Sequence, residues 1–213
     1  TELPDPNKGF SSNTSFIYYN DSASKIGSFS VQNRQSITYD EMPQNLRDAV
    51  VSAENRTFWS DPGISVKGMS RAAFSVLRGG DVQGGSTITQ QYIKVLYLSQ
   101  ERTMQRKLKE LVLADKMGRK VPKEDILAGY LNTIYFGRGA YGVQAAAKAY
   151  FNIDAKDLDL RQAAVLAAVL NNPTLFDPSD GPAARERLLG RYRYVLDGML
   201  EMGRISQNDH DAA

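Results

Sequence analysis

The stretch Leu46-Arg-Asp-Ala-Val-Val-Ser-Ala-Glu54 carries the periodicity that decides the fold. Its apolar positions recur at the i, i+3, i+4, i+7 spacing of a single helix face: Leu46, Ala49, Val50 and Ala53. Pro43 precedes this pattern, and a glutamate closes it. The stretch therefore predicts an amphipathic helix that brings the carboxylate of Glu54 to its carboxyl end.

The same helical period returns several times toward the C-terminus. The further segments expected to be helical are 66–77, the segments that follow Ser86 and Ser99, 122–131, the alanine-rich stretch 145–149, 160–170 and about 183–203. Ser86 and Ser99 are the expected N-caps of the segments that follow them. In the segment after Ser99, the side chains expected to face the core are Met104, Leu108, Leu111 and Val112.

Residues 1–38 show a different pattern. Aromatic and β-branched residues at 16–19 and 26–31 flank a polar turn at 20–22, which predicts a short β-ribbon. The predicted class is therefore mainly α with a small N-terminal β-ribbon. We expect one domain over residues 1–213, in which a ribbon and linker (1–38) precede a helical catalytic core (39–205).

The residue types that are absent exclude several kinds of chemistry. The chain has no cysteine, so a thiolate nucleophile and a Cys-ligated metal are excluded. Its single histidine, His210, lies in a polar C-terminal stretch, so we expect neither a buried Ser-His-Asp triad nor a multi-His zinc site. Any acid–base catalysis must use Asp, Glu, Lys or Tyr. No apolar run approaches the ~20 residues needed to span a bilayer.

The charge of the chain is unevenly distributed. A net charge of only +2 argues against a dedicated nucleic-acid binder. Between Lys94 and Lys123, however, nine basic residues stand against three acidic ones, a local net charge of +6. The residues that share one helix face there are Thr103, Arg106, Lys107 and Glu110. This segment suits an anionic partner, although a solvated surface helix with an Arg106–Glu110 pair is the simpler explanation of the segment alone.

The string Gly84-Gly-Ser-Thr-Ile-Thr-Gln-Gln91 strengthens the case for an anion site. Two glycines let the backbone approach a ligand closely. The helix that begins near Ser86 and Thr87 offers free N–H groups and the positive end of its dipole. A lone glycine loop before a capped helix is common, but the complete string is far more specific.

That string resembles the second conserved motif of the family 51 glycosyltransferases, the peptidoglycan polymerases that occur in bifunctional penicillin-binding proteins and as monofunctional enzymes. Further stretches agree with this family in order and spacing. They are Glu54-Asn-Arg-Thr-Phe58 followed by Gly63, Arg106-Lys-Leu-Lys-Glu110, Lys123-Glu-Asp-Ile-Leu-Ala-Gly-Tyr-Leu-Asn132 continued by Tyr135-Phe-Gly137, and, more loosely, Arg191-Tyr-Arg-Tyr-Val-Leu196. The resemblance covers about residues 38–205.

The resemblance implies roles for the matching positions. Glu54 resembles the catalytic base that removes the proton of the acceptor sugar's 4-hydroxyl, and Glu110 resembles the second essential carboxylate. The residues implied to surround the lipid-linked pyrophosphate or to line the site are Arg71, Ser86, Thr87, Gln90, Gln91, Lys94, Arg102, Arg106, Lys107 and Asn132.

The resemblance also implies a fold, a substrate and a location. It implies a lysozyme-like helical fold and an inverting reaction, in which lipid II extends a lipid-linked glycan chain through β-1,4 bonds. This chemistry requires no cofactor and no metal ligand set, while an accessory Mg²⁺ or Mn²⁺ stays open. The implied location is the extracytoplasmic face of the bacterial cell membrane, with an anchor outside these residues, and a C-terminal transpeptidase domain is an expected partner. The residues that match a bilayer-dipping lobe, or else form ordinary core, are Ile64, Val66, Met69, Phe74 and Leu77.

Two positions depart from the family's first motif: Asn55 stands where Asp is usual, and Asp61 stands where His is usual. These departures leave a non-catalytic lipid II binding module as one alternative. A lytic, glycan-cleaving enzyme of the same fold is another, because such enzymes also use paired carboxylates. The cation-rich segment favours a polymerase, since a pyrophosphate leaving group needs charge stabilisation that a neutral glycosidic leaving group does not need.

Overall fold

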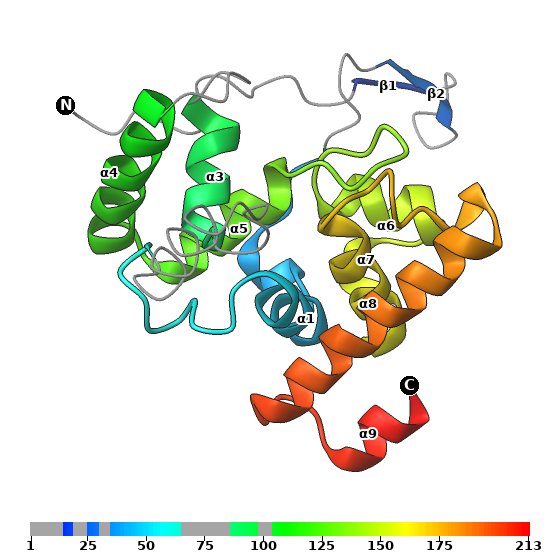
Figure 1. Ribbon diagram of the computed structural model, residues 1–213. Coiled ribbons are helices and arrows are strands. Elements are labelled where there is room, and N and C mark those ends of the chain that lie inside the picture. Colours follow the sequence, from blue (N-terminus) through cyan, green and yellow to red (C-terminus); the bar gives the residue numbers. More distant parts are fainter. Residues whose placement is uncertain (1–14, 19–24, 30–34, 65–85, 98–103) are drawn as a thin grey trace.

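The computed structural model describes residues 15–18, 25–29, 35–64, 86–97 and 104–213, which are mostly helical (Figure 1). The helices are α1 (Gln44–Glu54), α3 (Ile88–Tyr97), α4 (Met104–Lys120), α5 (Lys123–Thr133), α6 (Val143–Phe151), α7 (Leu160–Leu170), α8 (Pro182–Glu201) and α9 (Gln207–Ala212). Short 3-10 turns are η1 (Tyr39–Glu41), η2 (Ala155–Asp157) and η3 (Pro178–Asp180). Strands β1 (Ser15–Tyr18) and β2 (Lys25–Phe29) pair antiparallel, with Ser15 opposite Phe29. The predicted ribbon and the mainly α class are confirmed.

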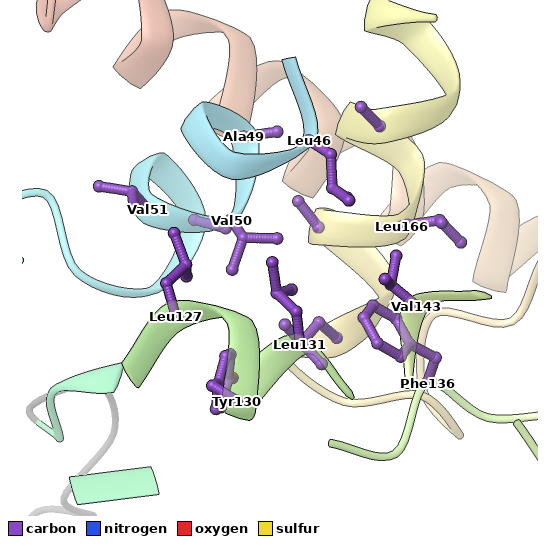
Figure 2. Close-up of a cluster of buried hydrophobic side chains, with 14 of the residues drawn as sticks. Leu46, Ala49, Val50, Val51, Leu127, Tyr130, Leu131, Phe136, Val143 and Leu166 are labelled. Carbon is purple, nitrogen blue, oxygen red and sulfur yellow. The ribbon is translucent and has the colours of Figure 1, made fainter. Parts of the chain in front are cut away.

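Helix α1 is central to the packing. It lies against α7 and α8, while α3 packs on α4 and α5 (Figure 1). Figure 2 shows side chains of α1, α5 and α7 gathered into one apolar cluster, with Val50 of α1 beside Leu127 and Leu131 of α5. Burial of this apolar surface stabilises the arrangement by roughly 25 cal/mol per Å² removed from water. The cluster holds α1, and therefore Glu54 at its end, against α5.

Two helices match the sequence pattern closely. Helix α1 ends on Glu54 as predicted, and α7 has the predicted bounds, 160–170. Asp159 caps α7 by accepting a hydrogen bond from the Gln162 backbone N–H, and Gln162 Oε1 accepts one from the Asp159 backbone N–H. This capping box satisfies two helix-end donors, which explains the sharp start of an otherwise apolar segment.

The prediction for the face of α4 was wrong. Leu108 and Val112 are 64% and 62% exposed, whereas Glu110, Ala114 and Met117 are buried. The cause is close backbone packing, because a Cβ added to Gly63 would lie 2.3 Å from the Ala114 carbonyl oxygen. Only small residues fit at such a contact, so α4 turns its Ala114 side inward and leaves Leu108 and Val112 exposed.

The predicted cap of α3 was also wrong. Thr87, not Ser86, caps the helix: the Gln90 backbone N–H donates to Thr87 Oγ1 at 3.1 Å. The Thr87 backbone N–H in turn donates to Gln90 Oε1 at 2.8 Å, completing a capping box one residue later than expected. The expected helix 66–77, the turn 20–22, the Ser99 cap and the side chain of Met104 lie outside the described residues.

Among the described helices, none combines the length and the hydropathy that crossing a bilayer requires. The last of them, α9, was not predicted, and it carries His210. Ser206 caps α9 and accepts a hydrogen bond from the Asp209 backbone N–H. His210 Nε2 lies 2.8 Å from Asp197 Oδ1 on α8, and its Nδ1 lies 3.1 Å from Asp211 Oδ1. The histidine therefore ties α9 to α8.

This tie predicts a pH-dependent contribution to stability. Hydrogen bonds to Asp197 and then to Asp211 raise the pKa of His210 above its ordinary value of about 6.5. The stabilisation is therefore fully present below that ordinary value and is lost as the pH rises through the raised pKa. We expect the difference in Tm between the wild type and His210→Gln to shrink between about pH 6 and pH 9. A Tm difference that stays constant over this range would show that the imidazolium contributes nothing.

Candidate active site

Glu54 is held between side chains from two other helices. Its carboxylate is only 8% exposed. Gln91 of α3 donates from Nε2 to Glu54 Oε2 at 2.8 Å, and Arg191 of α8 lies 3.4 Å from Oε1. The same Arg191 nitrogen donates to the Ala53 carbonyl oxygen at 2.7 Å, which fixes the guanidinium against the end of α1. These contacts hold the carboxylate in one orientation, as the positioning of a general base requires.

Tyr130 of α5 fixes the orientation of Gln91. Its hydroxyl donates to Gln91 Oε1 at 2.9 Å, which leaves the amide N–H₂ facing Glu54. Burial raises the pKa of the Tyr130 phenol well above its usual value, and the charge of Glu54 raises it further. The phenol therefore keeps its proton and donates a hydrogen bond to Gln91 Oε1. The Gln91 amide N–H₂ in turn donates to the Glu54 carboxylate, which can only accept.

Removal of this donor should lower turnover without removing the base. We expect Tyr130→Phe to reduce kcat roughly three- to tenfold with little change in KM, since the Gln91 amide can then rotate away from Glu54. Loss of the hydrogen bond to Gln91 Oε1 should also lower the free energy of unfolding by about 0.5–1.5 kcal/mol. Tyr150→Phe is the matched control, because Tyr150 donates to the Phe136 carbonyl oxygen at 2.8 Å in another region. A kcat for Tyr130→Phe no lower than that of the control would contradict this role.

Glu110 forms a second buried cluster on α4. Its side chain is 3% exposed and accepts from Arg106 at 3.2 Å and from Lys107. Lys107 Nζ also lies 3.2 Å from Ser86 Oγ at the start of the α3 segment. A carboxylate this deeply buried needs paired cations, because an isolated buried charge is strongly destabilising. The sequence pattern alone favoured a surface ion pair here, and the structure shows a buried one.

The two clusters are joined through one short segment. Ser86 contacts the Glu110 cluster through Lys107, and Gln91, five residues later, contacts Glu54. The helical part of this segment rises about 1.5 Å per residue, so the connection is short and rigid. The start of α3 therefore contacts both carboxylate clusters, one through Ser86 and Lys107 and the other through Gln91.

The predicted site residues differ in what they contact. Gln91, Ser86, Arg106 and Lys107 are joined to the two carboxylates as described, and Lys94 is exposed on α3. Thr87 and Gln90 are buried, and their polar atoms cap α3. Substrate contacts of these residues stay predictions. Arg71 and Arg102 lie outside the described residues.

Asn132 lies in a different setting. Its amide donates to the Ile37 carbonyl oxygen at 2.8 Å, and its Oδ1 accepts from the Ile37 backbone N–H at 3.0 Å. Both polar groups of this side chain therefore bind the segment that precedes η1. The contact attaches residue 37 to α5, and a substrate contact for Asn132 stays a prediction.

Arg191 and Tyr130 were not among the residues predicted to form the site. Both lie inside stretches that match family motifs, and this was the one available signal. Among the described residues, no three of His, Cys, Asp and Glu gather into a metal-ligating group.

Comparison with known proteins shows the family of the chain. Residues 21–200 match the transglycosylase family, so the chain belongs to that family. It is 46% identical over 185 residues to penicillin-binding protein 1A of Mycolicibacterium smegmatis, covering 84% of this chain and 23% of that protein. It is 44% identical over 188 residues to penicillin-binding protein 1A of Aquifex aeolicus, covering 88% of this chain and 26% of that protein. The chain thus spans about a quarter of the length of these relatives.

The fold also agrees with a solved structure. The crystal structure of penicillin-binding protein 1A from Haemophilus influenzae superposes with a TM-score of 0.51 at 23% identity, covering 95% of this chain and 20% of that one. At this identity the likeness shows the fold alone. The expected lysozyme-like helical domain is confirmed.

Proposed function

We propose that this chain is a peptidoglycan glycosyltransferase that polymerises lipid II, with residues 39–205 as the catalytic unit. The observation that carries the proposal is the carboxylate of Glu54, oriented by Gln91 and Arg191 and joined through the start of α3 to the cations of α4. Membership of the transglycosylase family supports it.

In the proposed reaction, Glu54 removes the proton from the 4-hydroxyl of the acceptor disaccharide. That oxygen attacks the anomeric carbon of the lipid-linked donor, and the bond from this carbon to the diphosphate oxygen breaks. A β-1,4 glycosidic bond forms with inversion, and polyprenyl diphosphate leaves with the bonding electron pair. Positioned bases contribute about 10²–10⁴-fold to such steps.

The cations near Glu110 are proposed to stabilise the leaving diphosphate. Arg106 and Lys107 are partly exposed and held by Glu110, while Lys94 is exposed on the neighbouring helix. Preorganised positive charge of this kind stabilises the developing negative charge without reorganisation during the reaction. Ser86, Arg71 and Arg102 are proposed to complete this anion site, and an accessory Mg²⁺ or Mn²⁺ is compatible with it.

We further propose that the protein works at the extracytoplasmic face of the cell membrane, because its substrate is lipid-anchored. The exposed pair Leu108 and Val112 on α4, flanked by Lys109 and Lys116, has the mixed apolar and cationic character that suits a headgroup interface. A penicillin-binding transpeptidase domain is a proposed partner, in keeping with the names of the relatives.

The test is an assay of glycan chain formation from labelled lipid II in detergent or vesicles, with and without moenomycin. We expect lysozyme-sensitive chains that moenomycin suppresses. The same protein incubated with finished peptidoglycan should release no muropeptides. Release of muropeptides without chain formation would instead support the lytic alternative.

A further inference from the structure

The turn that follows α1, residues 55–63, is joined to α5 by a buried ion pair that the proposed mechanism does not use. Asp61, whose side chain is 7% exposed, lies 3.1 Å from Nζ of Lys123, the first residue of α5. Asp61 also accepts from the Asn55 amide at 2.8 Å and from the Gly63 backbone N–H at 2.9 Å. Lys123 is 17% exposed, and its Nζ lies 4.6 Å from the centre of the Phe58 ring. A pair this well satisfied fixes the turn firmly.

The same turn contacts the helices that carry the rest of the site. Thr87 Oγ1, at the start of α3, donates to the Gly63 carbonyl oxygen at 2.6 Å. On the other side, Gly63 packs against Ala114, and a Cβ added to Gly118 would lie 2.3 Å from the Pro62 carbonyl oxygen. Ala114 lies one helical turn after Glu110 on α4. The turn is therefore a spacer between the end of α1 and the inner face of α4.

Two residues of this spacer, Asn55 and Asp61, account for the buried charge in the turn. Asn55 and Asp61 are the two positions that depart from the family's first motif. Here the amide of Asn55 donates and the carboxylate of Asp61 accepts. The carboxylate brings a negative charge into a buried turn, and the ammonium of Lys123 neutralises it.

We propose that Asp61, paired with Lys123, is a positioning residue that sets α4, and with it Glu110, at a fixed distance from Glu54. This inference rests on the proposed function, because the distance matters only if both carboxylates serve one reaction. Displacement of catalytic groups by about 1 Å can lower the rate about a hundredfold. The pair therefore acts on kcat rather than on affinity for lipid II.

The test compares Asp61→Asn, Lys123→Met and the double variant in the lipid II polymerisation assay. We expect each single change to lower kcat about ten- to a hundredfold while KM changes less than about threefold. The double variant should lose about as much kcat as each single one, because partners in one contact are not additive. The double variant leaves no buried charge unpaired, so it should fold even if a single variant does not. Its kcat then decides the test. Lys123→Arg should recover most of the rate.

A matched control separates positioning from stability. Arg138 and Asp177 form another partly buried ion pair, at 2.7 Å, between the turn after α5 and η3. Asp177→Asn should lower Tm but leave kcat unchanged. A double Asp61/Lys123 variant that behaves in the same way, or that raises KM at constant kcat, would overturn the proposal.

Hydrogen exchange of the backbone amides over 110–118 gives a readout that does not depend on activity. We expect faster exchange in the Asp61 and Lys123 variants than in Asp177→Asn. Altered exchange together with an inactive wild type would refute the proposed function and leave the positioning intact. Unaltered exchange with unaltered kcat would refute the positioning alone.

Discussion

Glu54→Gln should lower kcat for chain formation by about 10²–10⁴-fold and leave the affinity for lipid II within about threefold of the wild type. Glutamine keeps the size of the side chain and an oxygen that can accept from Arg191, but it cannot take a proton from the acceptor hydroxyl. The buried surroundings of Glu54 contain no second carboxylate among its described partners, which are Gln91, Arg191 and the nearby Tyr130. None of these three partners can therefore replace it as the base. Initial rates from labelled lipid II, measured by gel separation of the chains, give the comparison.

Glu201→Gln is the matched control for this variant. Glu201 also pairs with an arginine, Arg56, but it is exposed near the end of α8. Its loss should leave kcat unchanged, because exposed ion pairs contribute little. Comparable losses of kcat in the two variants would point to a general effect of removing a carboxylate rather than to the loss of a base.

Glu110→Gln should be the second most harmful single change, with kcat lowered by about 10²–10³-fold. Glu110 holds Arg106 and Lys107 in place, and Lys107 also contacts Ser86. The neutral amide cannot hold both cations, so the positive charge that should meet the leaving diphosphate moves or becomes solvated. Because this charge develops mainly in the transition state, the loss should appear in kcat more than in KM.

The same helix offers a control for Glu110→Gln. Asp115 and Arg119 form an i, i+4 pair on the exposed side of α4. Asp115→Asn should change kcat less than about twofold, because such pairs contribute about 0.3–0.5 kcal/mol. If Glu110→Gln kept wild-type kcat and lowered only Tm, Glu110 would be a structural residue and the proposed anion site would lose its support.

Local patterns predicted the helices wherever one face of a helix meets the core. The period of Leu46 to Glu54 gave the correct end of α1, and the apolar run 160–170 gave both bounds of α7, because burial on one face leaves that period in the sequence. The pattern failed at Leu108 and Val112, since the inner face of α4 is defined by close backbone contact at Ala114 and not by apolar volume. Hydrophobicity carries no signal for a contact of that kind.

The candidate site shows a similar division. Glu54 and Glu110 were predicted as site residues because the motifs around them are specific, and Gln91 was predicted from the same strings. The partnership of Glu54 with Arg191, 137 residues apart, depends on how α1 crosses α8. No spacing rule within one helix encodes that crossing. The burial of Glu110 was likewise missed, because an Arg-Lys-x-x-Glu face is compatible with either a solvated or a buried ion pair.

The central claim is that Glu54 is the base of a polymerase. A single-turnover measurement of the first glycosidic bond tests it most directly, with lipid II binding measured on the same wild-type and Glu54→Gln samples. We predict equal binding, formation of the β-1,4-linked product by the wild type, and none by the variant on the same time scale. Equal bond formation by both proteins, or binding without bond formation by the wild type, would contradict the account.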